Sequence, residues 1–597
     1  MKKVSNIAYS VTRRRFLRDA TLTSVGMIAA ACAPGSPPAG ASPTPGGGGA
    51  AVKGGAFHGA WPYDLPPKGH FNYFAASGAI LQGSVYQDTF MPALGMWNWN
   101  DAKWEYFLAE SSSLAGNVFT VKLRPNLKWS DGAAFTSKDV VTTFTVGRMD
   151  NFAIWNYIDK VEAEGDLSVK FTFKTPSSLG ERNILRIPIR PDSLYGTFAT
   201  RAAALYTQGK VNTAPEVVAL RAEKDALRPT APASVGPYKI DPASITEARL
   251  TLVRNTGGLF ADKVNFDTLV MYQGETAQVT PLVIAGDIDY ATHGFPLATD
   301  KSFTDNGIRV VRGPAYTGPA IVFHWEKAAA FQDKRLRQAV AHAINKDESA
   351  TITYGASAKS QKFMAGFSDN LVPQWISSAD QSKLNAYAYD VAKATSLMQA
   401  AGYAKGSDGI WAKGGQKLEF ELYFPSDFAD WASAADHAQK ALNSFGIKIT
   451  PRGAIRSQQL PDVNAGNFQI AIMGWGIGNP HPQGSYIQDL RTHNTVPAGG
   501  GYKYPLKQGN VDFDALINKM GDGFDTNAQK APVTEAALAF NDLLPVIPLW
   551  ERYGNNPVND KKRVKGWKPD GDPIYKNAFG TDNFTVLMIM NGTLSKI

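Results

Sequence analysis

Alternating apolar and polar residues mark several short strands in the first half of the chain. Residues 119–123 and 169–173 alternate strictly, as half-buried strands do. Thr136 precedes Asp139 by three residues at the start of an apolar run, which is the spacing of a capping box and predicts a short helix there. Further strand patterns occur at residues 250–254 and 268–272.

Helical periodicity becomes prominent in the second half. Residues 331–345 place Leu, Val, Ala and Ile on one face, and residues 431–445 repeat apolar side chains at helical spacing before Gly446, which fits a helix-ending position. Strand–helix–strand alternation predicts parallel α/β packing, with ligands gathering beyond the carboxyl ends of strands. We therefore expect the binding site at loop 474–482, after the last of the strands at residues 418–424, 447–449 and 468–473.

The first fifty residues have the pattern of an export signal followed by a flexible tether. Residues 13–15 are three arginines, followed by Phe-Leu and, over residues 20–31, an uncharged stretch of small and apolar residues. This pattern is typical of an export signal and resembles a twin-arginine signal. Ala29-Ala30-Ala31-Cys32 resembles a lipobox, although the lipobox pattern prefers Leu at the first position. The alternative is an unmodified Cys32 near an ordinary cleavage site. Residues 32–50 are rich in Pro and Gly, as solvated tethers are.

Composition and charge exclude several classes of protein. The 597 residues are 44% hydrophobic and 19% charged, so the chain is not disordered. One cysteine excludes a disulfide scaffold and thiolate-held zinc or iron–sulfur centres. The net charge is +8, but residues 1–31 hold six Lys and Arg against one Asp, so removing them leaves +3. A nearly neutral mature chain argues against a nucleic-acid partner.

Several segments resemble solute-binding protein family 5, the extracytoplasmic receptors of ABC transporters. The sequences LRPNLKWSDG (residues 123–132) and FTSKDVV (residues 135–141) carry the resemblance most clearly. Other segments match in the same order, from about residue 55 to residue 555, at residues 235–238, 285–289, 331–333, 337–345, 445–447, 473–475 and 547–549.

The resemblance implies an α/β, two-lobe periplasmic-binding-protein fold (type II, cluster C), with an extra mostly β subdomain inserted in lobe I. Ligand would be captured between lobes that close by a hinge motion. It also implies ABC permease subunits as partners of a monomer held at the membrane by its lipid anchor. The implied boundaries are residues 55–90, 232–313 and 540–597 for lobe I, 91–231 for the insert, and 314–539 for lobe II.

The loop after Trp475 bears on which ligand is bound. In peptide-binding relatives, an Asp three residues after the matching Trp holds the ammonium group of the peptide. Here that position is Gly478, and residues 474–486 contain no carboxylate. Because an unpaired buried charge is costly, this counts against peptides unless another carboxylate serves. The Asn479–Pro482 segment instead resembles the cello-oligosaccharide binders, as does the region of Trp61 and Asn72.

Thirteen tryptophans add to the argument for a sugar, because flat aromatic rings cover the apolar faces of pyranoses while neutral polar groups bond the hydroxyls. Trp129 and Trp431 are expected to be structural, and residues 97–100 to form a hairpin turn in preference to lining the cleft. The candidate substrate-binding residues are Trp475, Trp61, Asn72, Trp325, His324, Asn479 and His481.

Catalytic and metal-binding motifs are missing from the sequence. It contains no H-E-x-x-H, G-x-S-x-G or P-loop pattern, and its eight histidines include no i, i+4 pair. A glycosidase needs only two carboxylates, which spacing does not exclude, but the family resemblance implies a protein that binds and releases its ligand. We therefore expect no enzyme activity, cofactor or metal, and an extracytoplasmic lipoprotein that binds a β-linked oligosaccharide, cello- or manno-oligosaccharide-like. The alternatives are a peptide receptor of the same family, a nickel-type relative, a secreted glycosidase and an adhesive surface protein.

Overall fold

The computed structural model describes residues 52–75, 77–494, 500–577 and 580–597. All of them belong to one compact unit that begins at Ala51. The predicted export signal, the tether and Cys32 lie outside the described residues.

The first lobe is built on a four-stranded sheet in the order β1-β10-β9-β8. Strands β1 and β10 are parallel, and β9 pairs antiparallel with both β10 and β8. The strands predicted at residues 250–254 and 268–272 are confirmed as β9 and β10. The elements of this lobe are β1 (Ala56–Ala60), β8 (Tyr238–Ile240), β9 (Arg249–Arg254), β10 (Thr268–Tyr272), α5 (Thr276–Ala285), α6 (Leu297–Asp305), β11 (Arg309–Val311), β24 (Asn556–Val558) and α17 (Phe584–Met590).

Residues 91–231, the predicted insert and hereafter the inserted segment, contain an antiparallel sheet in the order β4-β5-β7-β6. The predicted strands are confirmed, and so is the capping box, because the Thr136 N–H donates to Asp139 Oδ2 at 2.8 Å. The expectation of a mostly β insert is wrong, since four helices accompany the sheet. The elements are β2 (Gly95–Asn98), β3 (Lys103–Tyr106), β4 (Ala109–Ala115), β5 (Val118–Leu123), α1 (Ser137–Met149), β6 (Ile158–Ala163), β7 (Ser168–Phe173), α2 (Leu179–Leu185), α3 (Asp192–Thr207) and α4 (Pro215–Asp225).

The second lobe contains a five-stranded sheet in the order β18-β17-β19-β12-β22, in which β17 is parallel to both β18 and β19. Helix α12 connects β17 to β18, buries Ala434, Ala438 and Leu442, and ends at Gly446 with φ 104°, as predicted. The principal elements are β12 (Gly318–Phe323), α7 (Lys334–Ala343), α8 (Lys346–Tyr354), α9 (Val372–Trp375), α10 (Ser378–Gln381), α11 (Val391–Ala400), β17 (Glu419–Pro425), α12 (Ala429–Phe445), β18 (Lys448–Ala454), α13 (Arg456–Asn464), β19 (Ile470–Trp475), α14 (Gln483–Ile487), α15 (Phe513–Lys519), α16 (Lys530–Leu543) and β22 (Val546–Pro548).

The end of the second lobe differs from the expected boundary at residue 540. Strand β22 pairs with β12 through Ala320, Ile321 and Val322, so it belongs to the second sheet although it was assigned to lobe I. The reason is that a strand from the far end of the chain completes this sheet, which no local pattern reveals.

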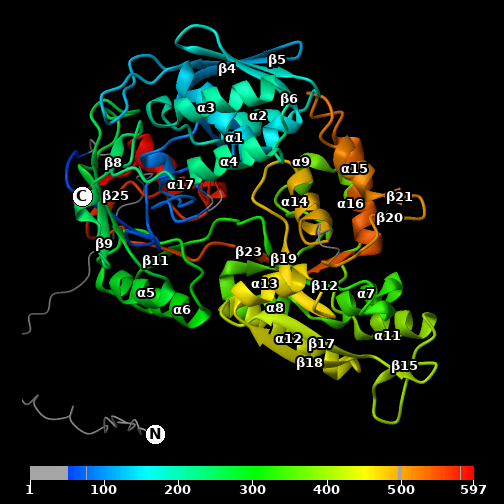
Figure 1. Cartoon of the computed structure of the whole chain (residues 1–597). Coiled ribbons are helices and arrows are strands. Elements are labelled where there is room, and N and C mark those ends of the chain that lie inside the picture. Colours follow the sequence, from blue (N-terminus) through cyan, green and yellow to red (C-terminus); the bar gives the residue numbers. More distant parts are fainter. Residues whose placement is uncertain (1–51, 76, 495–499, 578–579) are drawn as a thin grey trace, which may run out of the picture. The chain divides into compact units, whose positions relative to one another are not determined.

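Two segments, residues 312–318 and 549–555, run together between the lobes (Figure 1). The Ala315 N–H donates to the Arg552 carbonyl at 2.9 Å, and the Arg552 N–H donates to the Thr317 carbonyl at 2.8 Å. A paired two-stranded connection of this kind can bend while keeping its register, so we regard it as the hinge candidate.

Gly318 offers a test of this connection. A Cβ at Gly318 would lie 1.9 Å from the Trp550 carbonyl oxygen, so Gly318→Ala should force the paired segments apart. We expect a loss of roughly 3 kcal/mol in stability, as overpacking gives, measured by thermal unfolding. Gly257→Ala is the control, because its Cβ would meet only the Lys128 side chain at 3.3 Å. Equal melting temperatures for Gly318→Ala and the wild type would contradict the expectation.

Candidate functional site

A cavity of about 480 Å³ lies between the inserted segment and the second lobe. One wall comes from the β2–β3 hairpin, the region before β6, and α2; the other comes from α9, the loop after β19, α14 and the start of α16. Its lining residues are Trp97, Ala102, Trp104, Ala153, Tyr157, Ser178, Leu179, Glu181, Arg182, Asn183, Gln374, Trp375, Asn479, Pro480, His481, Gln483, Gly484, Ile487, Thr526, Asn527 and Lys530.

The hairpin supplies two of the aromatic rings. Trp97 of β2 stands opposite Trp104 of β3, and their ring centroids lie 5.2 Å apart in an edge-to-face arrangement. Asn98 Oδ1 accepts the N–H groups of Asn100 and Asp101, which closes the turn. Residues 97–100 therefore form the expected turn, and Trp97 also lines the cavity.

Trp375 provides the aromatic ring of the opposite wall. Its indole Nε1 donates to the Pro480 carbonyl at 3.1 Å, and its ring meets His481 edge-on at 4.5 Å. These two contacts fix the orientation of the indole before any ligand arrives. No sequence signal singled out Trp375, because α9 is a single short turn whose partner loop lies a hundred residues away.

His481 is buried in the wall and electrically neutral. The Gln483 N–H donates to Nδ1 at 3.1 Å, which places the ring proton on Nε2, 3.2 Å from Gln529 Oε1. Burial lowers the pKa of His481 to about 4, with the Gln529 hydrogen bond acting in the opposite direction. Asn479 Oδ1 accepts the His481 N–H at 3.0 Å. Asn479 and His481, two of the residues predicted to bind substrate, thus lie in the cavity wall. Their contact with ligand stays a prediction.

Helix α2 places two charged side chains in the wall. Burial raises the pKa of Glu181, and the nearby Trp104 indole acts in the opposite direction. Arg182 Nη2 donates to Asp582 Oδ2 at 2.7 Å, while Arg182 Nη1 has no hydrogen-bond partner among the described residues. With Lys530 from the start of α16, the described lining presents one carboxyl group, one anchored guanidinium and one ammonium group among mostly neutral groups.

The same two walls are joined by a direct bridge at residues 176–178 and 521–523. The Ser178 N–H donates to the Gly523 carbonyl at 2.8 Å, and the Gly523 N–H donates to the Pro176 carbonyl at 2.9 Å. Ser178 Oγ donates to Gln529 Oε1 at 2.9 Å. Gln529 therefore links the bridge to His481 in the cavity wall.

Trp475 does not line the cavity, contrary to our expectation. Its ring is fully buried and its Nε1 donates to the Trp550 carbonyl at 3.1 Å. The physical reason is that β19 continues through Trp475, which pairs with Gly318, so the ring packs against the connection between the lobes instead of projecting from a loop.

Asn72 and His324 do not line the cavity either, and each is held by hydrogen bonds within the protein. Asn72 is fully buried, and its Nδ2 donates to the Lys224 carbonyl at 2.7 Å. His324 is 1% exposed, its Nδ1 accepts the N–H groups of Glu326 and Lys327, and its ring packs on Phe468.

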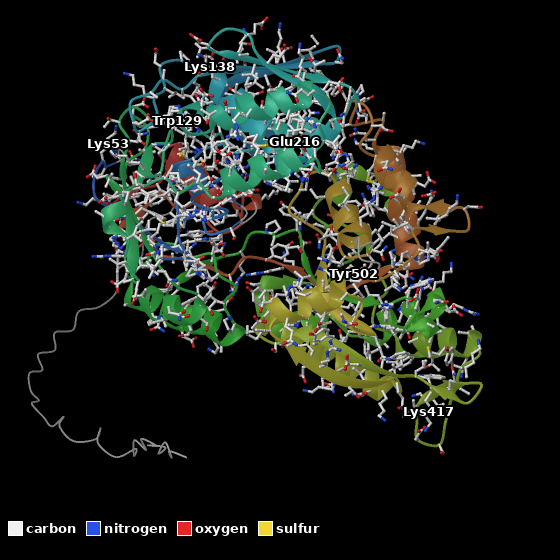
Figure 2. All side chains as sticks on the ribbon, viewed as in Figure 1. Lys53, Trp129, Lys138, Glu216, Lys417 and Tyr502 are labelled. Atoms are coloured by element: carbon white, nitrogen blue, oxygen red, sulfur yellow. The ribbon has the colours of Figure 1, made fainter. Side chains whose placement is uncertain are left out.

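The remaining two candidates lie at the edges of cores. The backbone N–H of Trp325 donates to the carbonyl of Tyr502, which is labelled in Figure 2. The Trp325 ring meets the Tyr504 ring edge-on, with centroids 5.1 Å apart. Trp61 follows β1, its N–H donates to the Tyr272 carbonyl, and its ring packs against the core of the first lobe. Neither lines the cavity. Backbone pairing fixes both residues locally.

No group of three His, Cys, Asp or Glu side chains able to hold a metal ion occurs within residues 52–75, 77–494, 500–577 and 580–597. Over the same ranges, no helix is long and apolar enough to cross a membrane.

Comparison with known proteins places these features in a family context. Residues 103–495 match the family model described as "Bacterial extracellular solute-binding proteins, family 5 Middle". A Brucella ovis protein named as a peptide-binding protein of an ABC transporter is 28% identical over 524 residues, covering 82% of this chain and 87% of that protein. A periplasmic oligopeptide-binding protein of Thermotoga maritima superposes with a TM-score of 0.72 at 18% identity, covering 91% of this chain and 99% of that chain. A structure of the Thermotoga maritima protein with bound mannohexaose gives a TM-score of 0.67 at 19% identity, with 91% and 98% covered.

The neutral His481 predicts a distinct pH dependence of stability. Its pKa is about 4 in the folded state and about 6.5 when unfolded. As the pH falls from 6.5 to 4, the His481 imidazole becomes protonated in the unfolded protein but stays neutral in the folded protein. The unfolding free energy should therefore fall by about 3 kcal/mol. Thermal unfolding of the wild type and His481→Gln from pH 4 to pH 8 tests this. We expect a flatter profile for the variant; parallel profiles would refute the assignment.

Proposed function

This chain belongs to the bacterial extracellular solute-binding proteins of family 5 and is the substrate-binding component of an ABC importer; on that premise we propose that it captures an oligosaccharide. The family consists of extracytoplasmic substrate-binding proteins and not of enzymes. Lipid attachment at Cys32 and delivery to membrane permease subunits are parts of the same proposal.

The observation that carries the proposal is the composition of the cavity. Trp97 and Trp104 form one wall and Trp375 the other, so a pyranose between them would have apolar C–H faces covered from two sides. Most of the polar lining is neutral, which suits hydroxyl groups. These neutral residues are Ser178, Asn183, Gln374, Asn479, Gln483, Thr526 and Asn527.

Binding would follow from bringing two walls together without any covalent step. The β2–β3 hairpin and α2 hold one side of the ligand, and Trp375 with loop 479–484 holds the other. The paired segments at residues 312–318 and 549–555 would allow the lobes to separate and close. That the same fold holds a mannohexaose in the Thermotoga maritima protein supports the choice of ligand class.

A peptide is the second candidate, favoured by Glu181. This carboxyl group lines the cavity and makes no ion pair among the described residues, so it is positioned to meet an ammonium group. The names of relatives as peptide-binding proteins favour the same ligand. For a sugar, Glu181 would instead accept hydroxyl hydrogen bonds.

The direct test is calorimetric titration of the mature protein with β-linked manno- and cello-oligosaccharides and with a mixed peptide pool. We expect a saccharide to bind, and Trp97→Ala and Trp375→Ala each to weaken binding about tenfold, or about 1.4 kcal/mol, through loss of ring contact. Trp567→Ala is the control, because that half-buried ring stacks on Tyr290 away from the cavity. Binding of peptides alone would sink the proposal.

Glu181→Gln separates the two ligand classes without changing side-chain size. For a peptide, removing the one carboxylate among the described residues that line the cavity should cost roughly a hundredfold in Kd, because a buried ammonium loses its counter-charge. For an oligosaccharide we expect less than about a tenfold change, since an amide still accepts a hydroxyl hydrogen bond. Titrations at pH 7 measure both, with Glu105→Gln, on strand β3 of the β2–β3 hairpin and not among the residues that line the cavity, as the control.

A further inference from the structure

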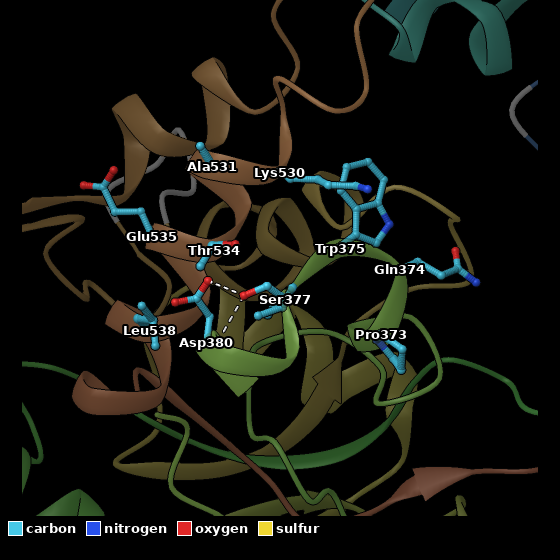
Figure 3. A pocket seen from close by; sticks show the side chains of 11 residues that line it. Pro373, Gln374, Trp375, Ser377, Asp380, Lys530, Ala531, Thr534, Glu535 and Leu538 are labelled. Atoms are coloured by element: carbon cyan, nitrogen blue, oxygen red, sulfur yellow. Dashed lines mark hydrogen bonds between the residues drawn. The ribbon is translucent and has the colours of Figure 1, made fainter. Parts of the chain in front are cut away.

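A second, outer cavity of about 600 Å³ lies on the second lobe between the α9–α10 segment and α16 (Figure 3). From α16 it takes side chains at positions 530, 531, 534, 535 and 538, which recur at helical spacing on one face. Its lining residues are Pro373, Gln374, Trp375, Ile376, Ser377, Asp380, Lys530, Ala531, Thr534, Glu535 and Leu538.

The outer cavity adjoins the inner one. Gln374, Trp375 and Lys530 line both, so the two spaces meet at these three side chains. Trp375 is the fixed part of this junction, because Pro480 and His481 hold its indole. A chain molecule that extends from the inner cavity past this ring would reach the outer surface of α16.

The chemistry of the outer cavity resembles that of the inner one. Leu538, Ala531 and Pro373 give an apolar floor, and Thr534 and Ser377 supply hydroxyl groups. Asp380 is oriented by the Ser377 hydroxyl at 2.7 Å (Figure 3). Lys383 Nζ pairs with the same carboxylate at 2.7 Å. Its carboxylate keeps further lone pairs for sugar hydroxyls. Apolar surface beside oriented acceptors is the combination that a pyranose requires.

The size of the inner cavity bears on ligand length. At about 480 Å³ it lies in the lower half of the range of about 300–1,000 Å³ for small-molecule sites. A short saccharide fits that space, whereas a longer one extends beyond it, and the outer cavity is the adjoining space beside Trp375.

We infer that the outer cavity is an additional subsite for the end of a linear oligosaccharide, so that the protein prefers chains long enough to pass Trp375 and rest on α16. The inference rests on the proposed function. It adds to it the class of substrate, an extended saccharide with one end outside the inner cavity.

A length series tests the outer subsite. The probes are β-1,4-linked mannose oligomers from mannobiose to mannohexaose and the matching cellulose oligomers, titrated by calorimetry into the wild type and Thr534→Arg. The arginine side chain would fill the outer cavity from the middle of its α16 wall. Thr351→Arg is the matched control, because it places the same change on an exposed position of α8 outside both cavities.

We expect the wild type and Thr351→Arg to bind the longest oligomer about tenfold more tightly than the shortest, which corresponds to about 1.4 kcal/mol. Thr534→Arg should lose that gain and keep its affinity for the shortest oligomer that binds. An identical length profile in Thr534→Arg and the wild type would overturn the outer subsite and leave the proposed function standing. Failure of every saccharide to bind the wild type would overturn both.

Discussion

One buried carboxylate, that of Asp582, holds together the elements that form the first wall of the cavity. It accepts hydrogen bonds from the Trp99 indole at 3.1 Å, from Arg182 at 2.7 Å and from Arg186 at 2.9 Å. Burial alone would raise its pKa, but the two guanidinium groups outweigh burial and hold the pKa of Asp582 below its ordinary value. Arg186 also pairs with Asp88, so the charges of this cluster are shared among several partners, as buried ions require.

This cluster ties the cavity wall to the connection between the lobes. The Trp99 ring stacks on Tyr316 with centroids 4.1 Å apart, and Tyr316 lies in the crossing segment. The Tyr316 hydroxyl donates to the Lys576 carbonyl, and Asn577 Nδ2 donates to the Trp97 carbonyl. The hairpin, the crossing segment and the C-terminal region thus share one set of contacts. A bend at the crossing segment would act on the ring of Trp97 through rigid, hydrogen-bonded neighbours.

The second wall is positioned differently, by neutral hydrogen bonds. His481 Nε2 hydrogen-bonds to Gln529 Oε1, which also accepts a hydrogen bond from Ser178 Oγ. The Trp375 indole donates to the Pro480 carbonyl and packs edge-on against His481. A neutral imidazole suits this position because both ring nitrogens have a partner and no buried charge needs compensation. The two walls therefore have their own supports and meet at the ligand space and at the bridge of residues 176–178 with residues 521–523.

The sequence by itself determined the local elements and the family. Alternation predicted β5 and β7, the Thr136–Asp139 spacing predicted the start of α1, and the periodicity ending at Gly446 predicted α12, because each depends on neighbours within a few residues. The tertiary structure alone decided which tryptophans line the cavity. Trp475 sits at the end of a strand whose partner lies far away in the chain, whereas Trp97 and Trp375 meet the ligand space through contacts to residues 577 and 480. Side-chain direction at such positions is set by long-range packing, which a linear pattern does not encode.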